Sequence, residues 1–337
     1  AGNYKTKRRF TKFGNMPELR NMFLEVADIQ TSEDLDLPVP KAKTVVHESH
    51  TTPEQVKYIE GLVARAEAIE ARLVKPYEDN MLKILGENKK LTMDMRMLDS
   101  HLYTEEDSEK ITQVVDSVYE IWAATKEERS TQMIFSDTGV PLKYRNNASY
   151  NLDRSVNSFS AYDEIKRLLV LRGVPEEEIR FIHEATDATK EQMMRDMRKG
   201  KIRILMASTS KGGTGLNVQD KLLAVHHLDV PWKPSDSTQR NGRIIRQGNE
   251  NEEVQIHIYI TKGSMDSFMW QTQEHKKRVV DQLMRGKSNV REIDEMDNEF
   301  GPSVYKAIAT DDPVKAEYMQ LEMQVENLEQ ARNRYYE

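Results

Sequence analysis

The chain has 337 residues, of which 38% are hydrophobic and 31% are charged, and its formal net charge is −7. This length usually corresponds to more than one packed unit. The sequence contains no cysteine, which excludes disulfides, zinc–thiolate sites, iron–sulfur clusters and a cysteine nucleophile. No apolar stretch approaches the roughly 20 residues of a membrane-spanning helix, so we expect a cytoplasmic protein with no membrane partner. Because the chain opens with Ala1 rather than Met, we expect it to be a piece of something longer.

The N-terminal third divides into two predicted segments. Residues 1–50 show no lasting periodicity, since basic residues give way to acidic residues and prolines, and this composition predicts an irregular arm. Thr51 or Thr52 can cap a helix with Pro53 in its first turn. Apolar residues then recur at helical spacing, so we expect a helical segment over residues 51–128.

The middle of the chain has the pattern of an α/β domain. Short apolar runs occupy residues 132–135, 179–183, 202–207, 222–228 and 254–260. Amphipathic segments lie between them, and one of these is expected to be capped by Ser160 and to end at Gly173. This alternation is typical of a parallel sheet with helices on both faces. The predicted α/β unit runs over residues 129–262.

Residues 263–337 are predicted to form a helical C-terminal extension. A helix is expected over residues 264–285, and apolar residues at spacings of four and three between residues 314 and 335 form a short heptad pattern. The heptads fit a helix that packs on its own domain. A coiled-coil arm or a helix that binds a partner protein is the alternative.

A glycine-rich turn follows the apolar run at 202–207. It reads Ser-Thr-Ser-Lys-Gly-Gly-Thr-Gly-Leu-Asn over residues 208–217. Backbone without side chains can approach a phosphate or a sugar closely and offers N–H donors to it. A tight strand-to-helix connection without a ligand explains the glycines equally well.

A second polar segment carries two arginines. Ser235 or Asp236 can cap a short helix on which Gln239, Arg243 and Arg246 occupy positions i, i+4 and i+7 and project from one face. Two guanidinium groups and an amide would then converge on one point, which suits the spread negative charge of a transferring phosphoryl group. The alternative is a pair of surface arginines bound to acidic side chains.

Together these two segments resemble motifs V and VI of superfamily-two helicases, and most closely those of the Swi/Snf-like branch of DNA-dependent ATPases. In that branch a Ser/Thr- and Gly-rich turn ending in Gly-Leu-Asn precedes an Asp-x-Pro-Trp-x-Pro turn and a Gln-x-x-Gly-Arg-x-x-Arg helix. The three elements stand here in the same order at residues 215–217, 229–234 and 239–246. Residues 133–136 resemble motif IV, and the resemblance covers roughly the middle half of the chain.

The resemblance implies a RecA-like lobe, the second of two, with Arg243 and Arg246 as arginine fingers directed at the γ-phosphate of ATP and ordered by Gln239. The residues that it places near the nucleotide are Gly213, Gly215 and Asn217, and those near the nucleic-acid backbone are Ser136, Ser208 and Thr209. Lys211 is a further candidate contact with DNA, which we expect to be double-stranded. The chain departs from the pattern at Ile245, where the family has His, and Arg240 has no assigned task.

The sequence shows no credible phosphate loop or acidic pair, which such an ATPase carries on its first lobe. The design requires a phosphate loop and an acidic pair that holds magnesium. Gly286-Lys287-Ser288 matches the end of a phosphate loop but follows no apolar strand, and the acidic residues 294–297 lie in a polar setting. We therefore expect ATP and Mg to be held mainly by an N-terminal RecA-like lobe of the same parent chain, and we expect no useful hydrolysis by this chain alone.

Three other interpretations stay open at the level of sequence. The chain could be a catalytically inert RecA-like module that binds nucleic acid or protein, or a separate nucleotide enzyme that uses Lys287. It could also be the helicase-like part of a phage or plasmid methylase–helicase protein. Strand separation and translocation along duplex DNA are not distinguished by the sequence.

Overall fold

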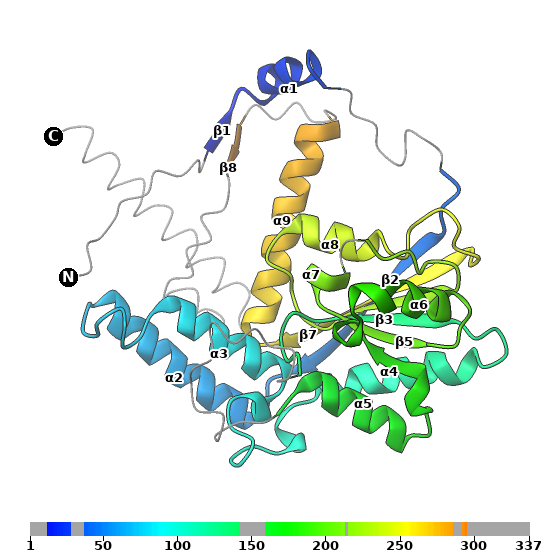
Figure 1. Ribbon diagram of the computed structural model, residues 1–337. Helices are drawn as coiled ribbons and strands as arrows, with labels where there is room; N and C mark the ends of the chain where they lie inside the picture. Colours follow the sequence, from blue (N-terminus) through cyan, green and yellow to red (C-terminus); the bar gives the residue numbers. More distant parts are fainter. Residues whose placement is uncertain (1–11, 28–36, 142–158, 213–214, 286–291, 295–337) are drawn as a thin grey trace.

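The computed structural model describes residues 12–27, 37–141, 159–212, 215–285 and 292–294. Its centre is a six-stranded sheet in which every pairing is parallel, with the strand order β2-β7-β6-β3-β5-β4 (Figure 1). The strands are β2 (Lys41–His50), β3 (Thr131–Phe135), β4 (Ile179–Phe181), β5 (Ile204–Ala207), β6 (Leu222–His227) and β7 (Glu253–Lys262). The predicted α/β class with a parallel sheet is confirmed.

Helices cover both faces of the sheet (Figure 1). The helices are α1 (Met16–Leu24), α2 (Pro53–Glu70), α3 (Met81–Met93), α4 (Lys110–Ala124), α5 (Ala161–Leu171), α6 (Asp187–Arg198), α7 (Thr209–Gly212), α8 (Pro234–Asn241) and α9 (Met265–Arg285). Alternate residues of β3 point to opposite faces. Ile134 packs with residues of α4 and α5, whereas Met133 and Phe135 pack with residues of α6. A short antiparallel pair, β1 (Lys12–Gly14) with β8 (Glu292–Asp294), forms a second sheet.

The structure corrects the predicted irregular arm, because residues 41–50 form the edge strand β2. This strand pairs along its whole length with β7, from Lys41 opposite Glu253 to His50 opposite Lys262. Most of its side chains are exposed or half-buried, so the strand shows no clear apolar alternation. Its partner is distant in the sequence, and local periodicity therefore gives no sign of the pairing.

The predicted boundary at residue 129 separates α4 from the α/β unit, whereas in the structure α4 packs on the sheet. Val114, Val115 and Val118 of this helix share one buried cluster with Ile134 and Ile204 of the sheet. In contrast, α2 and α3 form a buried cluster with α9 at the end of the domain. Of the two predicted helix caps, Thr51 and Thr52, the structure has Thr52, whose side chain accepts a hydrogen bond from the amide of Gln55 in a capping box.

Several predicted features lie outside the described residues. These are Gly213, the Gly286-Lys287-Ser288 sequence and the heptad pattern between residues 314 and 335. In the part of the chain that the structure describes, no helix combines the length and the apolar character needed to cross a membrane.

Candidate nucleotide and nucleic-acid site

Polar residues gather where β3, β5 and β6 end. These strands are neighbours in the sheet and run in the same direction, so their carboxyl ends meet at one edge, the usual place for ligands in parallel α/β sheets. Asp137 follows β3, Thr209 follows β5 and Asp229 follows β6. The helix α8 closes this edge and brings Arg240 to the three loops.

Arg240 is the centre of this arrangement, and its side chain is fully buried. Its Nε and Nη2 donate to Oγ1 of Thr209 at 2.9 and 2.7 Å. Nη2 also donates to carboxylate oxygens of Asp137 at 2.9 Å and of Asp229 at 3.1 Å, and Nη1 donates to the carbonyl of Asp229 at 3.0 Å. We call Arg240, Asp137, Thr209 and Asp229 the Arg240 network.

The two carboxylates of the network also bind backbone and hydroxyl donors. Asp229 accepts hydrogen bonds from the amides of Asp137 and Thr138 at 2.7 and 2.9 Å. Asp137 accepts from the amide of Thr209 at 2.7 Å and from its hydroxyl at 2.6 Å. Both hydrogen-bond donors of Thr209 are therefore engaged inside the network, and its predicted place near a nucleic-acid backbone stays a prediction.

The other residues predicted near nucleic acid differ in their exposure. Ser136 is fully buried and its hydroxyl donates to the carbonyl of Thr138 at 2.7 Å, so it supports the loop after β3. Ser208 is also buried, with its Oγ 3.3 Å from Nε2 of His183. Lys211 is exposed and remains the residue of this group that can reach a phosphate directly. Burial and then the charge of Lys211 lower the pKa of His183.

Arg243 and Arg246 converge on one backbone carbonyl. Nη1 of Arg243 donates to the carbonyl of Leu216 at 2.8 Å, and Nη1 of Arg246 lies 3.4 Å from the same oxygen. Burial and then the charge of Arg246 lower the pKa of Arg243. Ile244, between the two arginines, is fully buried in the core, so the backbone that carries them is anchored while their side chains point to the glycine-rich turn.

The convergence arises from a different local structure than the sequence predicts. The helix α8 begins with Pro234 after Lys233 and ends at Asn241, so Arg243 and Arg246 lie on the turns that follow it and not on one helical face. Gln239 is exposed, and its carbonyl lies 3.4 Å from Nε of Arg243. The contact of Gln239 with the arginine is therefore made by its backbone.

The glycine-rich turn presents Gly215 and Asn217 beside these arginines. Gly215 has a φ of +68°, a left-handed conformation that favours glycine. Both residues are exposed. The carbonyl of Asn217 accepts a hydrogen bond from Nη1 of Arg198 at 2.6 Å, so a third arginine, which the sequence patterns do not single out, also holds this turn.

The end of α8 is tied to β6 by a neutral histidine. Nε2 of His227 lies 2.7 Å from Oδ1 of Asn241. Burial, followed by the charge of Arg240, lowers the pKa of His227 to about 3. His227 is therefore uncharged at neutral pH and leaves the positive charge of this edge to the arginines.

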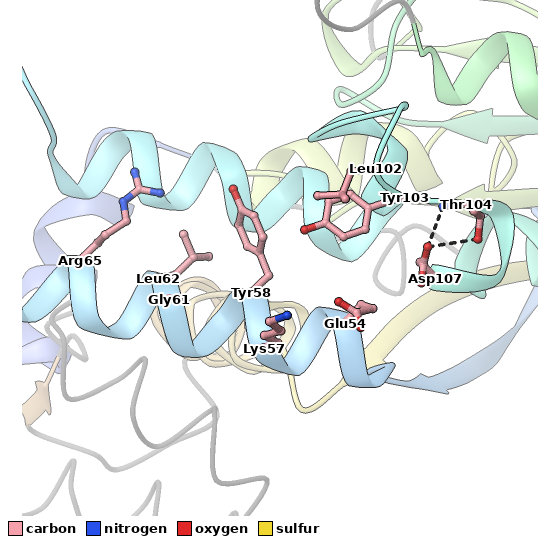
Figure 2. A pocket seen from close by; sticks show the side chains of 10 residues that line it. All are labelled: Glu54, Lys57, Tyr58, Gly61, Leu62, Arg65, Leu102, Tyr103, Thr104 and Asp107. Carbon is pink, nitrogen blue, oxygen red and sulfur yellow. Dashed lines mark hydrogen bonds between the residues drawn. The ribbon is translucent and has the colours of Figure 1, made fainter.

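A separate cavity of about 720 Å³ lies between α2 and the segment before α4 (Figure 2). Its lining residues are Glu54, Lys57, Tyr58, Gly61, Leu62, Arg65, Leu102, Tyr103, Thr104 and Asp107. Arg65 is held by Asp79 at 2.7 Å and is also paired with Glu87. None of the predicted site residues lines this cavity.

Residues 149–248 match the family model of the helicase conserved C-terminal domain. This part of the chain is therefore similar to helicase C-terminal domains. The match confirms the predicted resemblance to the C-terminal lobe of helicases, and the matched range contains the glycine-rich turn, α8 and both arginines that converge on Leu216.

Curated relatives match the chain over shorter stretches. Defense against restriction protein B of Escherichia phage P1 is 29% identical over 133 residues, which are 40% of this chain and 6% of that protein. The uncharacterized ATP-dependent helicase YqhH of Bacillus subtilis is 41% identical over 70 residues, 21% of this chain and 12% of that protein. DNA repair protein RAD5 of Candida albicans is 36% identical over 95 residues, 28% of this chain and 9% of that protein. The matches thus span between 6% and 12% of these relatives.

Solved structures with a similar chain include the SWI2/SNF2 ATPase core of Sulfolobus solfataricus in complex with double-stranded DNA. It is 16% identical, with 80% of this chain and 52% of that chain covered and a TM-score of 0.48. The C-terminal part of the Fun30 ATPase domain is 14% identical, with 73% and 96% covered and a TM-score of 0.46.

Proposed function

We propose that this chain is the second lobe of an ATP-dependent DNA helicase or translocase of Swi/Snf type. In this proposal Arg243 and Arg246 serve as arginine fingers for ATP that is held mainly by an N-terminal RecA-like lobe of the same protein. The observation that supports it is the meeting of both guanidinium groups at the carbonyl of Leu216, which belongs to the glycine-rich turn. Guanidinium groups at one point stabilise the negative charge of a transferring phosphoryl group.

The residues of this edge fit the phosphate end of a nucleotide better than they fit a magnesium ion. Arg243 and Arg246 supply positive charge, and the exposed backbone at Gly215 and Asn217 allows close approach. Among the described residues, no group of three or more His, Asp or Glu side chains is placed to hold a metal. Magnesium, which in such enzymes neutralises phosphate charge, would therefore take its protein ligands from the other lobe.

The proposed contact with duplex DNA is local and made through the phosphate backbone. The net charge of −7 disfavours general attraction to DNA, so the contact depends on exposed cations at the sheet edge, with Lys211 in the glycine-rich turn as the leading residue. Contacts of this type weaken as the salt concentration rises. Closure of the cleft between two lobes during hydrolysis would then move the protein along the duplex.

The relative from phage P1 favours one setting for this activity. Its printed name assigns that protein to defense against restriction, and the chain spans 6% of its length. A helicase-like part of a large phage or plasmid protein, including one with a fused methylase, is therefore the second candidate. In that setting the arginines keep the same role, and a large parent protein would carry the missing lobe.

The test is DNA-stimulated ATP hydrolysis by the protein that contains both lobes. Arg243→Ala and Arg246→Ala are each expected to lower kcat by about a thousandfold or more. The matched control is Arg167→Ala, because Arg167 is an exposed arginine on α5 that pairs with Glu164; this variant should keep the rate. If both finger variants hydrolyse ATP at the original rate, the inert binding module becomes the better description.

A further inference from the structure

Arg240 has no place in the function proposed above, although it is the most heavily hydrogen-bonded side chain at the carboxyl edge of the sheet. Its side chain is fully buried, so it touches neither a nucleotide nor DNA. We propose that Arg240 is a positioning residue. It fixes the glycine-rich turn, which carries Lys211, and the turn after α8, which carries Arg243, in one geometry. This inference rests on the proposed function, because the proposed function assigns DNA to the turn with Lys211 and ATP to the turn with Arg243.

On one side, Arg240 sets the start of the turn that carries Lys211. Two of its nitrogens donate to the hydroxyl of Thr209, and the amide and hydroxyl of Thr209 are bound by Asp137. Two residues later, the amide of Lys211 lies 3.2 Å from the carbonyl of Ser208. The direction in which Lys211 leaves the turn thus follows from how Thr209 is held.

On the other side, Arg240 is directly connected to the first finger. Its carbonyl accepts a hydrogen bond from the amide of Arg243 at 3.2 Å, and the next residue, Asn241, is held by His227. Arg243 in turn donates to the carbonyl of Leu216. Arg240 therefore connects the two turns, with its side chain bound to the turn after β5 and its backbone carbonyl bound to the turn after α8.

The chemistry of the guanidinium group explains why arginine is needed here. Its planar fork binds Asp137 and Asp229 with one nitrogen while the others bind Thr209 and a carbonyl. Lysine carries the same charge as a single ammonium group and cannot reproduce this fixed set of directions. Arg240→Lys should therefore keep the charge of the network and lose its geometry.

A double-mutant cycle on DNA affinity tests this inference in the 337-residue chain. The variants are Arg240→Lys, Lys211→Gln and their combination, and the probe is fluorescein-labelled duplex DNA followed by anisotropy. Arg240→Lys is expected to weaken binding about tenfold, and Lys211→Gln added to it should cause little further loss, because residues that act through one another are not additive. Asp137→Asn, on a carboxylate whose side chain is 41% exposed, provides a second variant if Arg240→Lys does not fold.

The matched control is Arg203→Lys at the opposite edge of the sheet. Arg203 is only 1% exposed, and it donates to the carbonyls of Ser130 and Thr125 and to the hydroxyl of Thr125. It therefore resembles Arg240 in burial and bonding, but it lies where the strands begin. Arg203→Lys should lower the melting temperature while the effects of Arg203→Lys and Lys211→Gln on DNA affinity remain additive.

Hydrogen exchange separates failure of this inference from failure of the proposed function. The amides of Asp137, Thr138 and Thr209 are bound to carboxylates of the network, so their exchange should accelerate in Arg240→Lys and remain unchanged in Arg203→Lys. Additive DNA affinities, or unchanged exchange at these amides, would overturn the positioning role. A wild-type chain that does not bind DNA would refute the proposed DNA contact, and the exchange result would still decide the role of Arg240.

Discussion

Gly212 packs against the core of the sheet, and the space around it is too small for a side chain. A Cβ atom added there would lie 2.5 Å from Cβ of Ala207 and 2.9 Å from Cε1 of Phe135. Both neighbours are completely buried in the sheet, so they cannot move aside cheaply. The glycines of this turn therefore have two functions, since Gly212 permits packing and Gly215 permits a left-handed backbone.

Gly212→Ala is expected to lower the free energy of unfolding by about 1–3 kcal/mol, because it overpacks a filled core. Urea titration of the chain measures this change. Gly86→Ala is the matched control: Gly86 lies inside α3 with nothing within 4 Å of an added Cβ. In that position alanine should raise the stability by up to about 1 kcal/mol. Equal stability of Gly212→Ala and the wild type would show that the turn can rearrange.

Some residues of the candidate site can be predicted from the sequence and others cannot. Arg243 and Arg246 were recognisable from their spacing and their motif, although they meet on turns and not on a helix. The Arg240 network was not recognisable. Asp137 and Asp229 are separated by 92 residues and meet Arg240 only because parallel strands end together. The one available signal is that each acid lies within two residues of the end of an apolar run.

At the scale of the elements, a row of histidines connects β2, β7 and β6. Nε2 of His47 lies 2.8 Å from Nδ1 of His257, and the ring of His226 stacks on that of His257 with centroids 4.5 Å apart. Burial, with the neighbouring His47, lowers the pKa of His257 to about 4. Burial, followed by the neighbouring histidines, lowers the pKa of His226 as well, so the row is neutral at pH 7.

The stability of the chain should therefore fall as the solution becomes acidic. In the unfolded chain histidines take up protons near pH 6.5, whereas folded His257 does so near pH 4. The unfolded state thus binds more protons in this window, and the free energy of unfolding should decrease from about pH 6.5 down to pH 4. Melting temperatures at pH 7.5, 6 and 5 measure the effect.

His257→Gln should reduce this dependence on pH, because it removes one group that between about pH 6.5 and pH 4 is protonated in the unfolded chain and neutral in the folded chain. His101→Gln is the control, since His101 is exposed and lies outside the row. If the melting temperature of the wild type is the same at pH 7.5 and pH 5, the row does not contribute to acid sensitivity in the way described.

The elements also differ in how well the sequence predicts them. The strands β3, β5, β6 and β7 are buried apolar runs and were expected within a few residues of their observed bounds. A continuous apolar run of this kind predicts a buried strand without information from the rest of the chain. The edge strand β2 is half-exposed and contains charged residues, so its pairing with β7 depends on tertiary structure. The short helix α8 has its N-cap at Lys233, two or three residues before the predicted caps Ser235 and Asp236.

For the whole molecule, β2 determines where the domain can be cut. A chain shortened to begin at residue 37 loses α1, whose Met22 and Phe23 are largely exposed, and it should fold with nearly unchanged stability. A chain shortened to begin at residue 51 also loses β2 and leaves the edge of β7 unpaired. Unpaired strand edges promote association with other chains, so this shorter chain should melt lower and elute as larger species.

Size-exclusion chromatography measures the size of the two shortened chains in solution, and thermal unfolding measures their melting temperatures. Identical profiles would mean that β2 is dispensable. Chains cut to the matched range of the family model, residues 149–248, lack β2, β3 and β7 altogether and should not fold on their own. A protein fragment designed for binding studies must therefore include the strand at Lys41–His50.

The pairing of β2 with β7 also has a consequence for the order of events on the ribosome. The partner of Lys41 is Glu253, and synthesis of the roughly 200 residues between them takes about 10–40 s at ordinary elongation rates. During that time the nascent segment has no neighbour in the sheet. Its lysines at positions 41 and 43 and its glutamate at position 48 oppose pairing with other nascent chains. The polar character that hides this strand from sequence patterns thus protects it until its partner emerges.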